Sequence, residues 1–298
     1  MSYSQLKQNK QQELEKIAKQ FADHNKASGF NDPRFWYPDI DKAGNGFAVI
    51  RFLPRLLEED SASVKLYYRS FKGPTGKYYS ENDLTTIGMA DPVNDLNRDI
   101  VAGRDWKTVD KKTQEVVSAQ KRKTKYISNI YVVKDSLHPE HEGKVYLFNY
   151  GVKIHGMIDA KMNPQFEGDD RMNPFDPEDG ANLKIRIRKG EGGFRDYSQS
   201  EWDKAGPLCS DEKFEIIYSQ LYPLAPFIAP DQFKSREVLE TKLAFVLGKT
   251  QANTTKAEVS SDQELPSSKG EKAATFEADT DSEIDPDFVS KYQNILDD

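Results

Sequence analysis

Residues 121–126 read Lys121-Arg122-Lys123-Thr124-Lys125-Tyr126, a dense run of cations that ends on an aromatic ring and leads into the apolar segment Ile130-Tyr131-Val132-Val133. The apolar segment is rich in β-branched residues, which indicates a strand over residues 126–133. Cations can follow a phosphate backbone and a ring can stack on a base, so the combination is typical of a protein that binds a single nucleic-acid strand. A basic run at the entrance of a strand is also common on ordinary surfaces. Recurrence of the pattern therefore decides between the two interpretations.

The pattern recurs in residues 183–189, where apolar and basic side chains alternate strictly. Alternation places three apolar residues on one face of a strand and three cations on the other. The cations are Lys184, Arg186 and Arg188. A glycine-rich turn then leads into Phe194-Arg195-Asp196-Tyr197, so cations and rings again lie together. The alternative is an ordinary antiparallel strand with a polar outer face, whose rings belong to the core.

Charge is distributed unevenly along the chain. Of its 49 acidic and 42 basic residues, 12 and 4 respectively lie in residues 251–298. That tail therefore carries a net charge of −8, and residues 1–250 carry +1. The overall acidity, which would argue against a nucleic-acid partner, belongs to the tail alone.

The size and composition of the chain indicate a globular protein of a reducing compartment. Its 298 residues suffice for one large domain with an inserted lobe, or for two smaller domains. The single cysteine, Cys209, cannot form an intrachain disulfide. Neither a signal peptide nor an apolar run approaching the ~20 residues needed to span a membrane is recognisable.

Short strand signals separated by polar turns dominate residues 32–151, which suggests a small barrel or sandwich. The expected strands are 47–53, 65–68, 126–133 and 144–150. Residues 80–117 look less regular, and an inserted lobe is expected over about 68–117. Residues 159–182, with three Asn-Pro or Asp-Pro pairs, are expected to form a long loop.

The DNA-binding core is expected to span residues 25–250. Helical patterns occupy the last third of this range. One helix is predicted from 211 to 222, capped by Ser210, and another from 235 to 247, ended by Gly248. On the second helix, Val238, Leu239, Leu243, Val246 and Leu247 are expected to form the apolar side.

Both ends of the chain carry amphipathic patterns. Residues 1–24 are expected to form an arm, with a helix over 5–24 that docks on its own domain or on a neighbouring molecule. Residues 251–298 are too polar to remain folded alone, yet they end in an apolar face that resembles a docking peptide. The residues of this face are Phe288, Val289, Tyr292, Ile295 and Leu296. The alternative is a solubilising tail with incidental apolar residues.

Four segments of the chain occur in the order of a known family. They are Asp41 to Pro54, Lys121 to Asp135, Glu142 to Val145, and Gly180 to Tyr197. In this order they resemble the T-even-type phage single-stranded DNA-binding, or helix-destabilising, proteins, and they cover most of residues 32–200. The resemblance implies a mainly β fold with flanking helices: an OB-fold-like barrel with an inserted lobe, an N-terminal arm for self-association and a disordered acidic C-terminal tail for partner proteins.

The resemblance also implies a cleft lined by cations and rings. Matched positions place the basic motif on Lys121, Arg122 and Lys123, and the stacking rings on Tyr126, Phe148, Phe194 and Tyr197; Phe148 stands where the family carries a tyrosine. With the neighbouring cations and rings, the expected DNA-binding residues are Lys121, Arg122, Lys123, Lys125, Tyr126, Phe148, Tyr150, Lys184, Arg186, Arg188, Phe194, Arg195 and Tyr197. The residues expected to mediate self-association are Lys7, Lys10, Leu14, Ile17 and Phe21.

Two departures from the family are expected to matter. Members carry a structural zinc in the lobe, held by one histidine and three cysteines, whereas residues 68–105 here contain neither residue type. No cofactor is therefore expected, and the lobe must be held by apolar packing. The residues available are Leu84, Ile87, Met89, Val93, Leu96, Ile100 and Trp106. The basic motif that the family repeats at its N-terminus is reduced to Lys7 and Lys10, which weakens the electrostatic part of cooperativity.

The expected function is binding without catalysis: sequence-independent, cooperative coating of single-stranded DNA during phage replication, recombination and repair, in the cytoplasm of the infected bacterial host. One alternative is a protein adaptor that acts through the acidic tail. Another is a metal-dependent nuclease, since Asp169, Asp170, Asp176 and Asp179 are of the type that holds Mg²⁺. They lie in a polar, proline-rich stretch where solvated acids are ordinary. His138 and His141, across a proline turn, lack further zinc ligands nearby.

Overall fold

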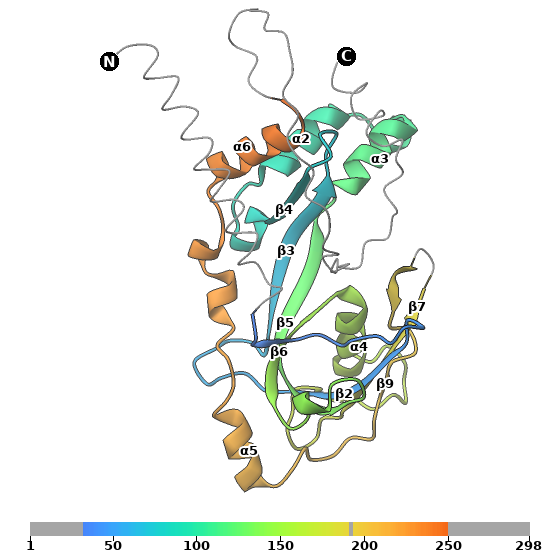
Figure 1. The fold of residues 1–298 in the computed structure, drawn as a ribbon, viewed down its shortest axis with the longest axis vertical. Helices are drawn as coiled ribbons and strands as arrows, with labels where there is room; N and C mark the ends of the chain where they lie inside the picture. The colour runs from blue at the N-terminus through green and yellow to red at the C-terminus, as the bar shows by residue number, and fades with distance from the viewer. Residues whose placement is uncertain (1–31, 191–192, 250–298) are drawn as a thin grey trace, which may run out of the picture.

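A single long strand, β5 (Lys123–Asp135), organises the computed structural model, which describes residues 32–190 and 193–249. One edge of β5 pairs with β6 (Val145–Tyr150), and the other pairs first with β3 (Ser63–Lys72) and then with β2 (Gly46–Phe52). In Figure 1, β3 and β5 run side by side along the long axis of the molecule. The strand predicted over residues 126–133 is confirmed, and β5 begins three residues earlier, inside the basic run.

The remaining strands extend the sheet on both sides. The hydrogen-bonded order is β1 (Phe35–Trp36), β6, β5, β2, β7 (Leu183–Lys189) and β8 (Arg195–Asp196). In addition, β4 (Tyr78–Asn82) pairs with β3, and β9 (Glu201–Trp202) pairs with β7. The fold is mainly β with several helices, as predicted. Among the strands of the described residues, these pairings form an open path and do not close into a ring.

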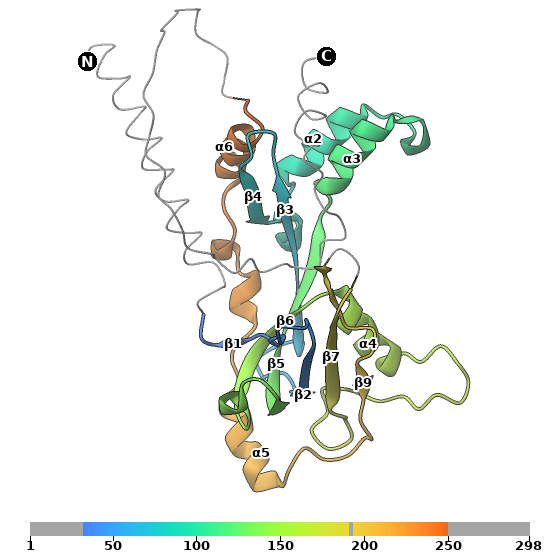
Figure 2. The same cartoon turned by 45° about the vertical axis from the view of Figure 1, so that its right-hand side comes forward.

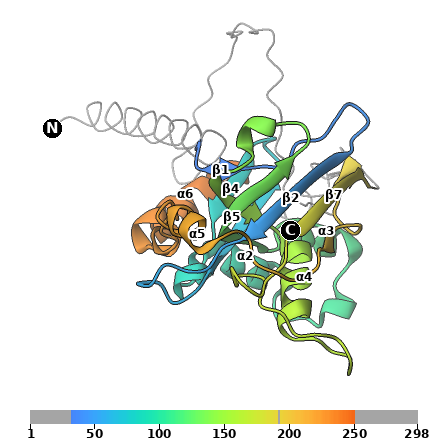
Figure 3. The ribbon, with the colours of Figure 1, turned by 90° about the horizontal axis from the view of Figure 1, so that it is seen from below.

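The body of the molecule is a core packed between the sheet and α4 (Val152–Met162). Alternation decides its composition: Leu183, Ile185 and Ile187 of β7 are all buried, as the sequence predicted. On the opposite side of β5, α5 (Asp211–Tyr218) packs against a separate cluster through Ile217. Figure 3 shows α4 and α5 on opposite sides of β5. β5 is therefore covered on both faces from Tyr126 to Val132.

The lobe is a second core at the far end of β3. It contains β4, two 3-10 turns, η1 (Leu84–Ile87) and η2 (Trp106–Thr108), and two helices, α2 (Pro92–Val101) and α3 (Lys111–Ala119). Five of the seven apolar residues expected to hold it belong to this core; they are Leu84, Ile87, Val93, Leu96 and Ile100. Met89 and Trp106 were wrongly included, because their side chains are 52% and 39% exposed.

The other half of the lobe core comes from the end of the described chain. Helix α6 (Arg236–Val246) packs against Phe71 and Tyr79 through Leu239, Leu243 and Val246. Figure 2 shows α6 and α2 flanking β3 and β4. The predicted apolar side of this helix is correct except for Val238, which is exposed.

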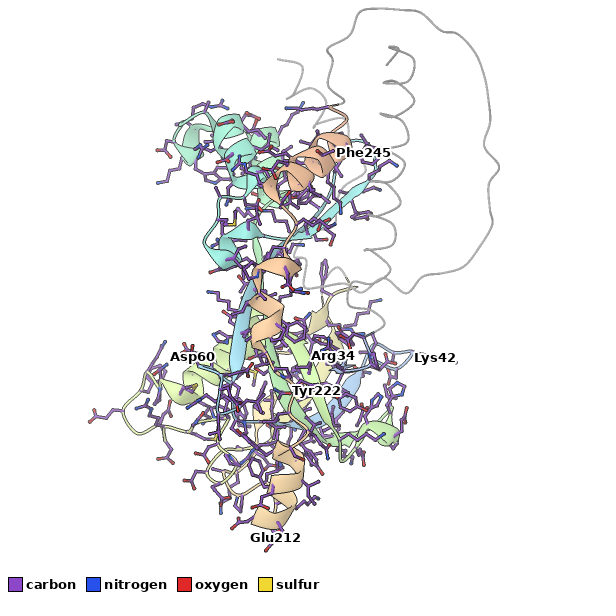
Figure 4. All side chains as sticks on the ribbon, turned by 90° about the vertical axis from the view of Figure 1, so that its left-hand side faces the viewer. Arg34, Lys42, Asp60, Glu212, Tyr222 and Phe245 are labelled. Atoms are coloured by element: carbon purple, nitrogen blue, oxygen red, sulfur yellow. The ribbon has the colours of Figure 1, made fainter. Side chains whose placement is uncertain are left out.

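Between α5 and α6, residues 219–235 run along the outside of the sheet. Two short 3-10 turns, η5 (Ala225–Ile228) and η6 (Pro230–Gln232), lie in this segment. Leu224 is buried against Leu66, Ile127 and Leu147, and Asn129 donates to the Tyr222 carbonyl at 2.8 Å. Figure 4 marks Tyr222 beside the sheet, with Glu212 of α5 and Phe245 of α6 at opposite ends. The predicted helix over 211–222 therefore ends at Tyr218, because the chain turns to pair with Asn129.

A buried ion cluster ties the lobe to β3. Arg69 Nε donates to Asp83 Oδ2 at 2.8 Å and lies 3.3 Å from Asp91 Oδ1. The guanidinium also donates to the Gln120 carbonyl and to Asn94 Oδ1. Asp83 caps η1 and Asp91 caps α2, so a single arginine holds the starts of two lobe elements. Burial, together with the nearby Asp83, raises the pKa of Asp91.

Several expectations lie outside the described residues. The arm over residues 1–24, the tail over 251–298 and their candidate contact residues are among them. The expected loop over 159–182 begins later than predicted, because α4 continues to Met162. Among residues 32–190 and 193–249, no helix is long and apolar enough to cross a membrane.

Candidate nucleic-acid interface

Strand alternation divides the basic run between two faces of the sheet. β3 and β5 pair so that Tyr67 lies opposite Thr124 and Tyr68 lies opposite Lys123. Arg122 therefore emerges on the face of Tyr67, whereas Lys123 and Lys125 emerge on the face of Tyr68. The sequence had placed these cations in one cleft.

Arg122 and two neighbours on β3 form a compact arrangement of cations around a ring. The Arg122 guanidinium carbon lies 3.7 Å from the centre of the Tyr67 ring, and Lys65 Nζ lies 5.0 Å from it. Arg122 Nη1 also donates to Thr85 Oγ1 at 2.8 Å, which fixes the guanidinium plane. A hydrogen bond from Lys65 lowers the pKa of Tyr67. We call Lys65, Tyr67 and Arg122 the cation–ring strip.

Lys121 also lies near an aromatic ring, on the side of the lobe. Its Nζ lies 5.6 Å from the centre of the exposed Trp106 ring. Lys65, Tyr67 and Trp106 were not among the predicted site residues. Residues 65–68 were recognised only as a strand, and Trp106 was assigned to the lobe core. The missing signal was the register between β3 and β5, which brings together residues 55 positions apart.

On the other face, the cations are less accessible. Lys125 Nζ lies 5.4 Å from the centre of the Tyr68 ring, and both Lys123 and Lys125 are half-buried. Burial lowers the pKa of each ammonium group. These two lysines are thus separated from the cation–ring strip and partly desolvated.

The cations of β7 are largely paired. Lys184 Nζ lies 3.1 Å from Asp203 Oδ1, and Arg186 Nη2 lies 2.6 Å from Glu201 Oε1. The hydrogen bond to Glu201 raises the pKa of Arg186. Arg188 is exposed at the end of the strand. Only part of the predicted row of positive charge therefore remains uncompensated.

The residues after β7 turn toward the start of the described chain. Arg195 Nη1 donates to the Pro38 carbonyl at 2.7 Å, which engages this cation in holding the turn. Tyr197 packs against the body core, and Phe194 is half-buried. These side chains lie on the turn expected from the sequence, but they are not fully exposed.

Three rings among the predicted DNA-binding residues are buried. Tyr126, Phe148 and Tyr150 are 8%, 3% and 4% exposed and belong to the body core. The Tyr150 hydroxyl hydrogen-bonds with Ser63 Oγ and Ser128 Oγ, both at 3.0 Å, and burial raises its pKa to about 12. Protein atoms cover these rings, so in this structure none presents an open face to a base.

The buried rings form a continuous stack that reaches the surface at a histidine. Phe148 and Tyr150 stack with ring centres 5.4 Å apart, and Tyr150 and Tyr126 with centres 5.7 Å apart. The imidazole of His155, from α4, stacks on the Tyr126 ring with 3.7 Å between the ring centres and only 8° between the ring planes. We call Phe148, Tyr150, Tyr126 and His155 the aromatic column. His155 was not predicted, because its helix carried no sequence signal for binding.

A pocket of about 490 Å³ lies at the outer end of the aromatic column. The residues that line it come from the segment before β3, from β3 and β5, from α4 and from the loop after α4. Those used below are Asp60, Ala62, Lys65, Tyr126, His155 and Asp159.

The acidic and histidine candidates for metal binding are either held in other contacts or exposed at the surface. Asp176 Oδ1 accepts the backbone N–H groups of Glu178 and Asp179, and Asp169 and Asp170 are exposed. His138 bridges the carboxylates of Asp39 and Glu140, which raises its pKa, and His141 contacts Asp135. In the described part of the chain, no three histidine, cysteine or acidic residues are gathered to hold an ion.

Residues 44–247 match a family model whose description is "gp32 DNA binding protein like". The chain belongs to this gp32-like family. A single-stranded DNA-binding protein of Enterobacteria phage T4 is 35% identical to it over 247 residues, which cover 80% of this chain and 79% of the relative. The protein of the same description from Enterobacteria phage T2 is 36% identical over 219 residues, covering 72% and 70%.

The gp32-like match spans both the lobe and the body. It begins two residues before β2 and ends one residue after α6, so the cation–ring strip and the aromatic column both lie inside it. Within the match, residues 68–105 hold neither histidine nor cysteine. There, the lobe carries the buried Arg69, Asp83 and Asp91 cluster.

Proposed function

We propose that this gp32-like protein binds single-stranded DNA without marked sequence preference and coats it during phage replication, recombination and repair. The observation that carries the proposal is the cation–ring strip, because Arg122 and Lys65 supply phosphate contacts beside the Tyr67 ring. Support also comes from the printed descriptions of the T4 and T2 relatives as single-stranded DNA-binding proteins. Binding occurs without catalysis, in the cytoplasm of the infected bacterium.

The proposal extends to parts of the chain outside the described residues. The N-terminal arm self-associates along the strand, and the apolar face at 288–296 docks replication and recombination proteins. The body is an OB-fold-like barrel, which the shared edge of β5 supports, since β2 and β3 follow each other along it. The lobe needs no zinc, which the Arg69 cluster supports. The adaptor and nuclease alternatives are not favoured.

We expect tight binding to a single-stranded oligonucleotide and weak binding to duplex. The logarithm of the affinity for a single strand falls with the logarithm of salt concentration by about 0.7 per phosphate contacted. Fluorescence titrations of both DNA forms at several salt concentrations measure this slope. Because single strands are bound better than duplex, the protein also lowers the melting temperature of DNA. Absence of binding at low salt would reject the function.

Deletion of residues 251–298 is expected to raise the affinity for DNA. The tail carries a net charge of −8 and competes with phosphates for the cations of the interface. The gain is largest at low salt and shrinks as salt screens the competition. Parallel salt titrations of the full chain and of residues 1–250 test this. Equal affinities at low salt would exclude competition by the tail.

A further inference from the structure

The aromatic column leads from the core of the body to the pocket at its outer end. Tyr126 is sandwiched between Tyr150 and His155, so a base cannot reach its ring while the imidazole remains in place. His155 is half-buried and lines the pocket. Tyr126, only 8% exposed, also lines the pocket, so the half-buried imidazole is the more accessible of the two rings that meet it.

Lys65 connects this pocket to the cation–ring strip. Its Nζ lies over the Tyr67 ring, and the same side chain lines the pocket. A phosphate bound by Lys65 would place the adjacent nucleotide within reach of both the Tyr67 ring and the pocket. The pocket has a volume of about 490 Å³ and is half open to solvent, which leaves room for one nucleobase. Figure 4 marks Asp60, one of the polar residues of its wall.

We propose that the pocket takes one base of the bound strand and that His155 stacks on this base as the outer ring of the aromatic column. The inference rests on the proposed function and names a contact residue for it. The rings beneath His155 act as its support: they are held in the core, and Tyr150 is fixed by two serine hydroxyls. A rigid support reduces the entropy lost when a base is stacked.

The charge around His155 indicates stacking rather than phosphate binding. Burial lowers the pKa of the imidazole, and Lys65 adds to this effect while Asp159 opposes it. The ring is therefore neutral near neutral pH. Its Nδ1 atom is buried without a hydrogen-bond partner among the described residues. Replacing His155 should consequently change the affinity and leave the salt slope unaltered.

The test is a titration of the full chain with a single-stranded oligonucleotide at several salt concentrations. His155→Ala is expected to lower the affinity roughly 5- to 100-fold, the loss of one stacked base, with an unchanged slope. His155→Phe keeps a flat ring and is expected to retain most of the affinity. His138→Ala is the matched control, because this histidine lies beyond the opposite end of β5 and should have no effect.

A second variant tests the pocket without altering the column. Ala62→Trp fills the pocket from the segment before β3 and is expected to lower the affinity as His155→Ala does. Unchanged affinity in both variants would overturn the inference. Higher affinity of His155→Ala would also overturn it, because the imidazole would then be a plug that the base displaces from Tyr126. If the unmodified chain fails to bind, the proposed function itself fails.

Discussion

Replacement of Arg69 by methionine is expected to destabilise the lobe by about 3–5 kcal/mol. The substitution leaves Asp83 and Asp91 buried without a counter-charge, and it removes the donors to Asn94 and the Gln120 carbonyl. Methionine fills a similar volume, so the loss arises from unpaired charge rather than from a cavity. Urea unfolding, with hydrogen exchange of the lobe amides, measures the effect.

Arg98→Met is the matched control for this prediction. Arg98 also pairs with a carboxylate, Asp95 at 2.9 Å, but its side chain is 71% exposed. Such exposed pairs contribute at most about 1 kcal/mol. If Arg69→Met were as mild as Arg98→Met, the buried cluster would not hold the lobe.

The combined change Tyr67→Ala and Arg122→Met is expected to cause the largest loss of DNA affinity. The tyrosine supplies a stacking surface worth about 1–3 kcal/mol, and the arginine supplies one phosphate contact. The two single substitutions separate these contributions. Tyr67→Ala lowers the affinity at constant salt slope, whereas Arg122→Met also reduces the slope by about 0.7. Salt titrations of the three variants measure both quantities.

A similar ring and cation elsewhere provide the control. Tyr78 is 63% exposed on β4, and Lys72 Nζ lies 5.9 Å from its ring centre. Tyr78→Ala should leave the affinity unchanged, and Tyr67→Phe should retain most of it. Equal losses for Tyr67→Ala and Tyr78→Ala would mean that the strip is not a specific contact surface.

Some local patterns were predictable because one strand contained the whole signal. The alternation of β7 is decided within seven residues, and its buried face agrees with the prediction. The lobe core was only half predictable, because Leu239, Leu243 and Val246 join Phe71 from more than 160 positions away. No periodicity within residues 68–117 contains that information.

The candidate site was predictable in its residue types but not in its accessibility. β6 is covered on both faces, with Phe148 in one core and Leu147 in another. A strand buried on both sides has no polar face, so its sequence cannot show which ring meets solvent. The β3 and β5 register likewise determined which cations share a face with Tyr67. Both facts depend on pairing between distant segments.

The edges of the sheet bear on how molecules can be crowded along one strand of DNA. Among the described strands, β1 and β8 end the hydrogen-bonded path and are two residues long, as is β9. The longer outer strand, β4, is covered by α6, whose Lys242 Nζ donates to the Ser80 carbonyl. Short or covered edges offer few free backbone groups for pairing between sheets. Neighbouring molecules can therefore reach a high local concentration on DNA without these edges seeding cross-β aggregation.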